Sequence, residues 1–311
     1  MGIHLLQEAL KFDPHNIDGL LAYGGMMAET QNWNEAERIF KIALEERPDL
    51  ANVYHNYGTY LQKRGMVAEA VEYYKIAYNI DERHSASMVN AAKALNQLGK
   101  NKEAENIVNR ALAIHRDSST LDVLGIIYYD SGQLQKSVSV FEEIKQQAPN
   151  NTDAILHYVH VLSDLDEFDK AEALLHQILN TEPYHIKALR EMAVLLALKN
   201  KHEEALPYIG LAVSKCKKPE MLQKLLFQQG NHYKDLKRYG EALKSYNEII
   251  KYDPKHVQAH LNIGGIHHLY ARLEKARHHY QITLKLDPGN SLATSNLARL
   301  QKIENNMKSN G

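Results

Sequence analysis

Small and large apolar residues recur at fixed intervals between polar positions along the chain. The pattern repeats every 34 residues or nearly so. Six of the eight prolines share one phase of this repeat, since 48 − 14, 183 − 149 and 288 − 254 each equal 34: Pro14, Pro48, Pro149, Pro183, Pro254 and Pro288. A period of this length predicts stacked supersecondary units.

Three positions carry the packing pattern when the recurring proline is numbered 32. Position 8 is small, with Val159 as the exception: Gly24, Gly58, Ala92, Gly125, Ala193, Gly230 and Gly264. Position 20 is Ala36, Ala70, Ala104, Ala171, Ala205, Ala242 and Ala276, with Ser137 in the fourth unit. Position 24 is large: Phe40, Tyr74, Val108, Phe141, Leu175, Ile209, Tyr246 and Tyr280. We expect position 8 of helix A to pack against position 20 of helix B, and position 24 to fill the space towards the next unit.

This pattern resembles the tetratricopeptide repeat (TPR). It predicts an all-α fold, a right-handed TPR α-solenoid of helix-turn-helix repeats. Residues 1–16 are then helix B of an incomplete repeat, and residues 291–311 are a capping helix and tail. Residues 17–290 form eight repeats: 17–50, 51–84, 85–117, 118–151, 152–185, 186–222, 223–256 and 257–290.

Two repeats depart from the period of 34. The third repeat has one residue fewer than 34, and the sixth has three residues more. The sixth also places Pro207 inside helix B, where proline removes a backbone donor and should kink the helix. We expect a longer turn from Cys216 to Pro219 and the main irregularity of the array there.

The chain begins in mid-repeat, because Gly2, Leu6, Ala9 and Pro14 occupy positions 20, 24, 27 and 32. Leu6 and Ile3 then lack the partner face of a helix A, and burying such a side chain is worth about 1.5 to 3 kcal/mol. We interpret the chain as a piece of a longer protein that continues upstream. A tolerated ragged start, or a helix covered by self-association, is the alternative.

Composition and charge narrow the choice of partners. Gly and Pro make up 16 + 8 = 24 of 311 residues, which favours a mostly helical chain. The 37 basic and 38 acidic residues are spread evenly, so no nucleic-acid partner is expected. The longest apolar stretches are far shorter than a membrane span, so we expect no direct membrane insertion by this chain. The single cysteine, Cys216, cannot form an intrachain disulfide.

Signals for catalysis or metal binding are weak. Six of the seventeen histidines gather in the last repeat and at the residue just before it: His256, His260, His267, His268, His278 and His279. His260 and His267 occupy positions 4 and 11, where TPR proteins normally pack Trp or Tyr, and no Cys, Asp or Glu completes a tetrahedral set. Phosphate-binding loops and nucleophile elbows are missing from the sequence. We expect no metal site, no cofactor and no catalytic residue in this chain.

A TPR array offers a concave groove lined by successive A helices, with positions 2, 5, 6, 9, 12 and 13 facing it. Amides recur there and can pair with the backbone of an extended peptide, which gives these candidate binding residues: Asn56, Asn90, Gln228, Asn231, Asn262 and Asn296. This partial ladder resembles the asparagine ladder in the TPR superhelix of the cytosolic O-linked N-acetylglucosamine transferase. Val123, His157 and Glu191 interrupt it. The alternative is that these are simply tolerated polar residues.

Another familiar TPR ligand is an acidic C-terminal tail, held by a clamp of Lys/Asn, Asn and Lys/Arg in three adjacent repeats. Leu21 and Gly25 occupy positions 5 and 9 of the first repeat, and Lys93 and Arg190 lie in non-adjacent repeats. A chaperone-tail adaptor is therefore disfavoured.

One sequon, Asn150-Asn151-Thr152, falls in the predicted turn between the fourth and fifth repeats. Asn150 would be exposed there. It is a candidate N-glycosylation site if the chain enters the secretory pathway.

Two segments resemble a particular family beyond the generic repeat. Residues 226–231, LFQQGN, and 260–280, HLNIGGIHHLYARLEKARHHY, are similar to the last repeats of the transmembrane and TPR-containing protein O-mannosyltransferases. In that family a multi-span membrane enzyme part comes first, and the TPR array is the C-terminal part in the lumen of the endoplasmic reticulum. The resemblance implies that the full-length protein transfers mannose from dolichyl-phosphate mannose to Ser or Thr of cadherin-type domains.

The family's catalytic carboxylates and donor-binding loops belong to the part that this chain lacks, so no catalytic residue can be carried over. We expect a protein-interaction solenoid in the lumen of the endoplasmic reticulum, as part of a membrane protein, that engages acceptor protein or partners. The alternative is a freestanding cytoplasmic TPR scaffold that assembles a protein complex and has no link to glycosylation.

Overall fold

The computed structural model describes residues 2–309, so that Met1, Asn310 and Gly311, at the ends of the two predicted terminal segments, lie outside it. Helices α1 to α18 follow one another within the described residues, which contain no strand. The predicted all-α TPR solenoid is confirmed. None of the described helices is both long and apolar enough to cross a membrane.

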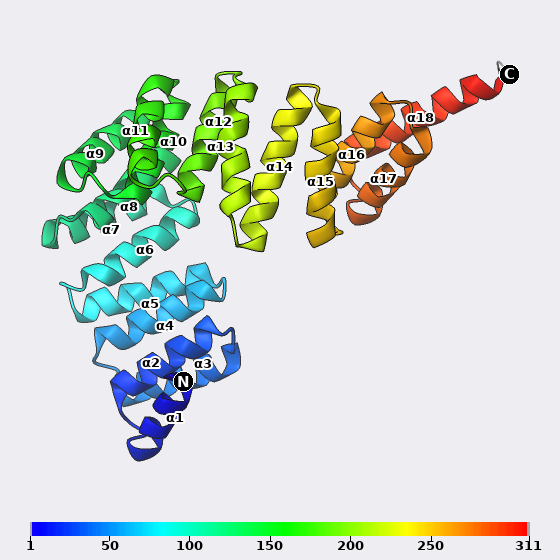
Figure 1. Cartoon of the computed structure of the whole chain (residues 1–311). Helices are drawn as coiled ribbons and strands as arrows, with labels where there is room; N and C mark the ends of the chain where they lie inside the picture. The colour runs from blue at the N-terminus through cyan, green and yellow to red at the C-terminus, as the bar shows by residue number, and fades with distance from the viewer. Residues whose placement is uncertain (1, 310–311) are drawn as a thin grey trace. The chain divides into compact units, whose positions relative to one another are not determined.

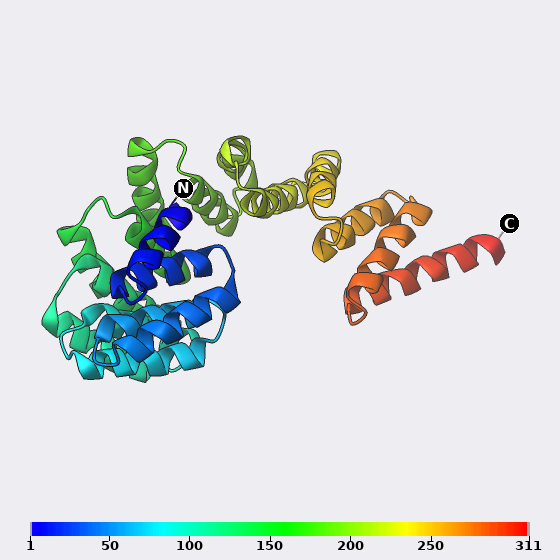
Figure 2. The same cartoon turned by 90° about the horizontal axis from the view of Figure 1, so that it is seen from below.

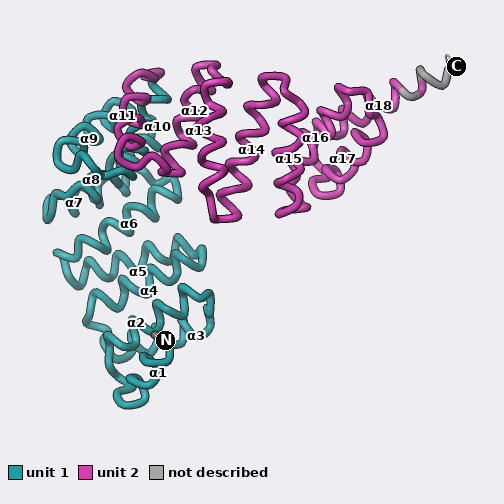
Figure 3. The backbone as a smooth tube through the Cα atoms, in the orientation of Figure 1, with its two compact units in different colours: residues 1–165 teal, residues 166–311 magenta. Residues whose placement is uncertain are grey.

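The chain divides into two compact units, residues 1–165 and 166–311 (Figure 3). Within each unit, consecutive helices lie side by side as antiparallel pairs (Figure 1). Unit 1 contains α1 (Gly2–Phe12), α2 (Ile17–Glu29), α3 (Trp33–Glu46), α4 (Ala51–Lys63), α5 (Val67–Ile80), α6 (Ser85–Gln97), α7 (Asn101–Ile114), α8 (Ser118–Asp130), α9 (Leu134–Gln147) and α10 (Thr152–Asp164). Unit 2 contains α11 (Phe168–Thr181), α12 (Ile186–Leu198), α13 (His202–Lys215), α14 (Pro219–Asp235), α15 (Tyr239–Tyr252), α16 (Val257–Leu269), α17 (Leu273–Leu286) and α18 (Ser291–Ser309).

Even-numbered helices are the A helices, and all but one begin at the first residue of a predicted repeat or of the predicted cap. The exception is α14, which begins at Pro219, four residues before Gln223. The prediction of a longer turn before α14 is wrong. Only Cys216 to Lys218 link α13 to α14, which is a shorter link than residues 47–50 between α3 and α4. The additional residues of the sixth repeat instead lengthen α14 to 17 residues. Proline suits a first helical turn, where its fixed φ is pre-organised and its missing N–H is not needed.

Helix α13 contains Pro207 and continues through it from His202 to Lys215. The backbone donor that proline lacks would have bonded the carbonyl of Glu203, which lies in the exposed first turn of the helix. Water can satisfy that carbonyl, so the helix tolerates the loss.

In the repeats with glycine at position 8, that position lies against the aromatic side chain at position 24 of the B helix in the same repeat. A Cβ atom added at Gly58 would lie 2.8 Å from Tyr74 Cε1. An aromatic ring covers the glycine in four further pairs: Gly24 with Phe40, Gly125 with Phe141, Gly230 with Tyr246 and Gly264 with Tyr280. The expected contact of position 8 with position 20 is also present, since a Cβ at Gly58 would lie 3.3 Å from the carbonyl oxygen of Ala70. Phe40 also contacts the next A helix, at 5.5 Å between its centroid and that of Tyr60.

The volumes at positions 8 and 24 are complementary. Where position 24 is aliphatic within a unit, as in Val108 and Ile209, position 8 is Ala92 or Ala193 instead of glycine. All four side chains are fully buried. The methyl group of the alanine thus fills space that a ring at position 24 would otherwise occupy, and the interior stays close-packed.

Ser137 is the one polar residue among the buried alanines of position 20. Its Oγ donates a hydrogen bond of 2.8 Å to the carbonyl of Gly125 in the paired helix. A hydroxyl buried with a partner costs little. The serine is therefore compatible with the packing.

Helix α1 has one open face. Leu5, at position 23, is 62% exposed, whereas Ile39 at the same position of the next B helix is 3% exposed. Leu6 is half-buried, and the side chain of Ile3 lies outside the described ones. The difference arises because Ile39 is covered by an A helix of its own repeat.

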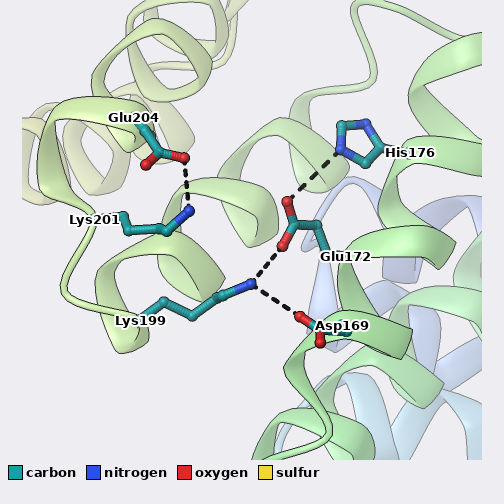
Figure 4. Close-up of polar contacts among 6 residues, drawn as sticks. All are labelled: Asp169, Glu172, His176, Lys199, Lys201 and Glu204. Carbon is teal, nitrogen blue, oxygen red and sulfur yellow. Dashed lines mark hydrogen bonds and ion pairs between the residues drawn. The ribbon is translucent and has the colours of Figure 1, made fainter.

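Ion pairs tie α11 to the end of α12 in unit 2. Lys199 Nζ lies 2.8 Å from Glu172 Oε2 and 3.2 Å from Asp169 Oδ1 (Figure 4). These two carboxylates raise the pKa of Lys199. Water screens ion pairs of this kind, so the cluster fixes orientation more than stability.

Helix α18 closes unit 2 against α16 and α17. Ala293 and Leu300 are fully buried in a cluster with Leu261, Ala276 and Tyr280. Beyond this contact, the C-terminal part of α18 extends past α17 in both views (Figures 1 and 2).

Adjacent glycines in α16 offer a matched test of the ring contact. A Cβ at Gly264 would lie 2.7 Å from Tyr280 Cε1, whereas one at Gly265 would meet nothing closer than 4.0 Å. We expect Gly264→Ala to lower the free energy of unfolding by about 1 to 3 kcal/mol through overpacking. Gly265→Ala should raise it by up to about 1 kcal/mol through helix propensity. Urea unfolding of the two variants checks this, and equal effects would contradict the packing account.

Candidate peptide-binding groove

A cleft of about 930 Å³ lies between α14, α16 and α18 in unit 2. Its lining residues are Lys234, Leu261, Asn262, Gly265, Ile266, His268, Leu269, Tyr280, Leu292, Asn296, Arg299, Lys302 and Ile303. Apart from Ile266 and Tyr280, they occupy the repeat positions that the TPR pattern assigns to the groove. The spacing of those positions puts them on one face of each A helix.

The core of the last repeat forms the floor of the cleft. Ile266 and Tyr280 are almost fully buried. Tyr280 lies under α16 because Gly264 leaves room for its ring. Next to it, Gly265 keeps the wall of the cleft bare of a side chain.

Three of the predicted amides lie at or beside this cleft. Asn262 and Asn296 line it from neighbouring A helices. Asn231 Oδ1 accepts a 2.7 Å hydrogen bond from the Tyr246 hydroxyl and a 3.5 Å hydrogen bond from Asn262 Nδ2. Burial raises the pKa of Tyr246, so its hydroxyl remains a donor. Gln228, one turn before Asn231, has a buried Oε1 without a hydrogen-bond partner among the described residues.

The other two predicted amides lie in unit 1 and do not line this cleft. Asn56 Nδ2 donates to the carbonyl of Asn52, at 2.7 Å on its own helix. Asn90 lies beside the Tyr74 hydroxyl; burial raises the pKa of Tyr74, and hydrogen bonds with Thr59 and Asn90 oppose that shift. Both amides already have local roles.

Cations and exposed leucines complete the cleft in unit 2. Lys234, Arg299 and Lys302 line it, and none forms an ion pair within the described part of the chain. Among the lining residues whose side chains are described, none is a carboxylate. Leu269 and Leu292 are 67% and 63% exposed. These five residues were not predicted as site residues, although they occupy groove positions 12, 9, 12, 13 and 2.

A smaller cleft of about 240 Å³ lies between α8, α9 and α10 in unit 1. Its surroundings are acidic: Asp130 lines it, and His157 Nδ1 lies 2.8 Å from Asp122 Oδ1. Tyr129 donates a 2.6 Å hydrogen bond to Asp164 Oδ2, and this bond together with burial raises the pKa of Tyr129 to about 12. The two clefts thus differ in charge.

Histidines of the last repeat pack inside the α16–α17 pair. His260 is buried, with its Nε2 3.0 Å from the carbonyl of Pro254 and its Nδ1 3.0 Å from His279 Nδ1. A carbonyl only accepts, so the Nε2–H of His260 donates to it, and the hydrogen bond between the two rings joins their Nδ1 atoms. Burial, reinforced by His260, His278 and His267, lowers the pKa of His279 to about 4. The described residues contain no group of three or more His, Cys, Asp or Glu placed to hold a metal ion.

The sequon lies in the turn between α9 and α10. Asn150 is exposed there. Asn151 Oδ1 accepts a 3.2 Å hydrogen bond from the Ala154 amide and caps α10. The acceptor asparagine itself has no part in the cap.

Comparison with known proteins agrees with this geometry. Family models described as tetratricopeptide repeat match residues 49–117, 128–192 and 227–291. The chain belongs to the tetratricopeptide repeat family, and it is a protein-interaction solenoid.

Among curated proteins, the chain resembles human protein O-mannosyl-transferase TMTC1, with 28% identity over 226 residues. The match covers 72% of this chain and 26% of that protein, so the chain spans about a quarter of its relative. Anaphase-promoting complex subunit 3 of Schizosaccharomyces pombe is 25% identical over 169 residues, 54% of this chain and 25% of that protein. The crystal structure of yeast Tom70 has the same fold, with a TM-score of 0.70 and 16% identity, over 94% of this chain and 65% of that one.

The histidine pair of the last repeat predicts a pH dependence of stability. His279 stays neutral in the folded chain, whereas the unfolded chain binds a proton below about pH 6.5. The free energy of unfolding should therefore fall as pH drops from 6.5 to about 4. His260→Leu/His279→Leu should flatten this fall, because leucine occupies the same two positions elsewhere, as in Leu20 and Leu174.

Urea unfolding between about pH 7 and pH 4 measures this slope. His115→Leu, which removes an exposed histidine, is the control and should keep the wild-type slope. An unchanged slope in the double variant would contradict the lowered pKa of His279.

Proposed function

We propose that this chain is the lumenal TPR region of an endoplasmic-reticulum protein O-mannosyltransferase, and that its groove engages acceptor protein or partners. The similarity to TMTC1 over 72% of the chain carries this proposal. The groove amides would hold extended backbone: Asn262 and Asn296 in the cleft of unit 2, with Asn231 and Gln228 beside them, and Asn56 and Asn90 in unit 1.

On this proposal the chain itself contributes binding and no chemistry. The full-length protein would use dolichyl-phosphate mannose as donor, and cadherin-type domains are the acceptor class that the family resemblance implies. Their β-strands are extended segments of the kind that backbone-directed amides can bind.

A second function is a cytoplasmic scaffold that assembles a protein complex. The similarity to anaphase-promoting complex subunit 3 favours it, over 54% of the chain. The two proposals place the chain in different compartments, the lumen of the endoplasmic reticulum or the cytoplasm. Glycosylation of the exposed Asn150 would distinguish them.

We expect the native full-length protein expressed in human cells to carry a glycan on Asn150, because the sequon is exposed in a turn. Endoglycosidase H should increase its electrophoretic mobility. Asn150→Gln and Thr152→Ala should both abolish the shift.

Asn151→Gln is the matched control, because it alters the neighbouring residue and leaves the sequon intact. It should keep the shift. A wild-type protein that migrates identically with and without the enzyme would contradict the lumenal proposal and favour the scaffold.

A further inference from the structure

The cleft of unit 2 carries positive charge that no described carboxylate at the cleft neutralises. Lys234 on α14 and Arg299 and Lys302 on α18 line the same cleft, and its described lining includes no carboxylate. Elsewhere in unit 2, several cations are paired with carboxylates, as Lys199 is with Glu172 and Arg238 is with Glu241. Three unpaired cations that converge on one cleft favour an anionic ligand.

Apolar side chains lie among these cations. Leu269 and Leu292 stand more than half exposed at the cleft, and Leu261 and Ile303 also line it. Large apolar residues at the surface that cluster around a hollow mark a binding site more often than scattered ones do. A ligand that satisfies the whole surface carries both carboxylates and apolar side chains.

We propose that the cleft between α14, α16 and α18 binds an extended acidic peptide segment in which Glu or Asp alternates with an aliphatic residue. Lys234, Arg299 and Lys302 bind its carboxylates, and Leu269 and Leu292 pack against its aliphatic side chains. Asn262 and Asn296 hydrogen-bond its backbone. The inference deepens the proposed groove function and rests on it for the binding of an extended chain.

The charge of the cleft in unit 1 makes this selectivity local. Asp122, Asp130 and Asp164 lie at or beside that cleft and would repel the same ligand. Arg190, a groove cation of α12, is bonded to the adjacent Glu191. Lys234, Arg299 and Lys302 in the cleft of unit 2 are therefore the cations that select an acidic segment.

Fluorescence anisotropy with two labelled ten-residue peptides tests the proposal on the intact chain. One peptide alternates Glu with Leu or Gly, and the other has Gln in place of every Glu. We expect the acidic peptide to bind about tenfold more tightly, with an affinity that falls as salt screens the charges. Lys234→Gln/Arg299→Gln/Lys302→Gln should reduce its affinity to that of the Gln peptide.

The matched control is Lys255→Gln/Lys275→Gln/Lys285→Gln, which removes the same charge from exposed sites outside the cleft and should leave binding unchanged. Asn262→Ala/Asn296→Ala should weaken both peptides equally, and this arm tests the groove amides independently of charge. Equal affinity of the two peptides, or acidic binding that survives neutralisation of the cleft, would overturn the acidic selectivity and leave the groove function intact. If neither peptide binds, this inference falls, while the glycan on Asn150 still decides the compartment.

Discussion

Contact between position 8 of helix A and position 24 of helix B is the interaction on which the rest of the structure depends. In five repeats an aromatic ring lies where a Cβ would be, from Gly24 with Phe40 to Gly264 with Tyr280. The ring fixes how closely the two helices approach and at which height along their axes. The A helices then present the same face repeat after repeat, and the groove positions line up. A cleft with amides and cations from three helices follows from this packing.

Much of the fold was predictable from the sequence, because its packing is periodic. A spacing of 34 residues, small residues at position 8 and alanine at position 20 identified the helical pairs and most of their starting residues. What failed was local. Pro219 reads as the end of a turn, yet it begins α14, because proline suits both places. Ala271 adopts a left-handed conformation with φ 53°. Gly65 occupies the same repeat position, and glycine adopts a positive φ more easily than alanine does. The tertiary packing imposes that conformation on alanine.

The candidate site was only half predictable. Asn262 and Asn296 follow from the amide pattern, because an amide at position 6 has an evident use in binding backbone. The cations do not, since the chain is nearly neutral and Lys234, Arg299 and Lys302 are separated by up to two repeats in the sequence. They converge only in the folded chain, where α14, α16 and α18 each contribute residues to one cleft. Net charge describes the whole chain, whereas recognition depends on the charge that one surface collects.

A double-mutant cycle on Gly264 and Tyr280 tests the packing claim most directly. The variants are Gly264→Ala, Tyr280→Leu and the two combined, and the combination reproduces the alanine and aliphatic pair found at Ala193 and Ile209. Because leucine makes room for the new methyl group, the combined variant should lose less free energy of unfolding than the sum of the single losses, by about 1 kcal/mol or more. Additive losses would contradict the claim that these two positions set the packing of the repeat.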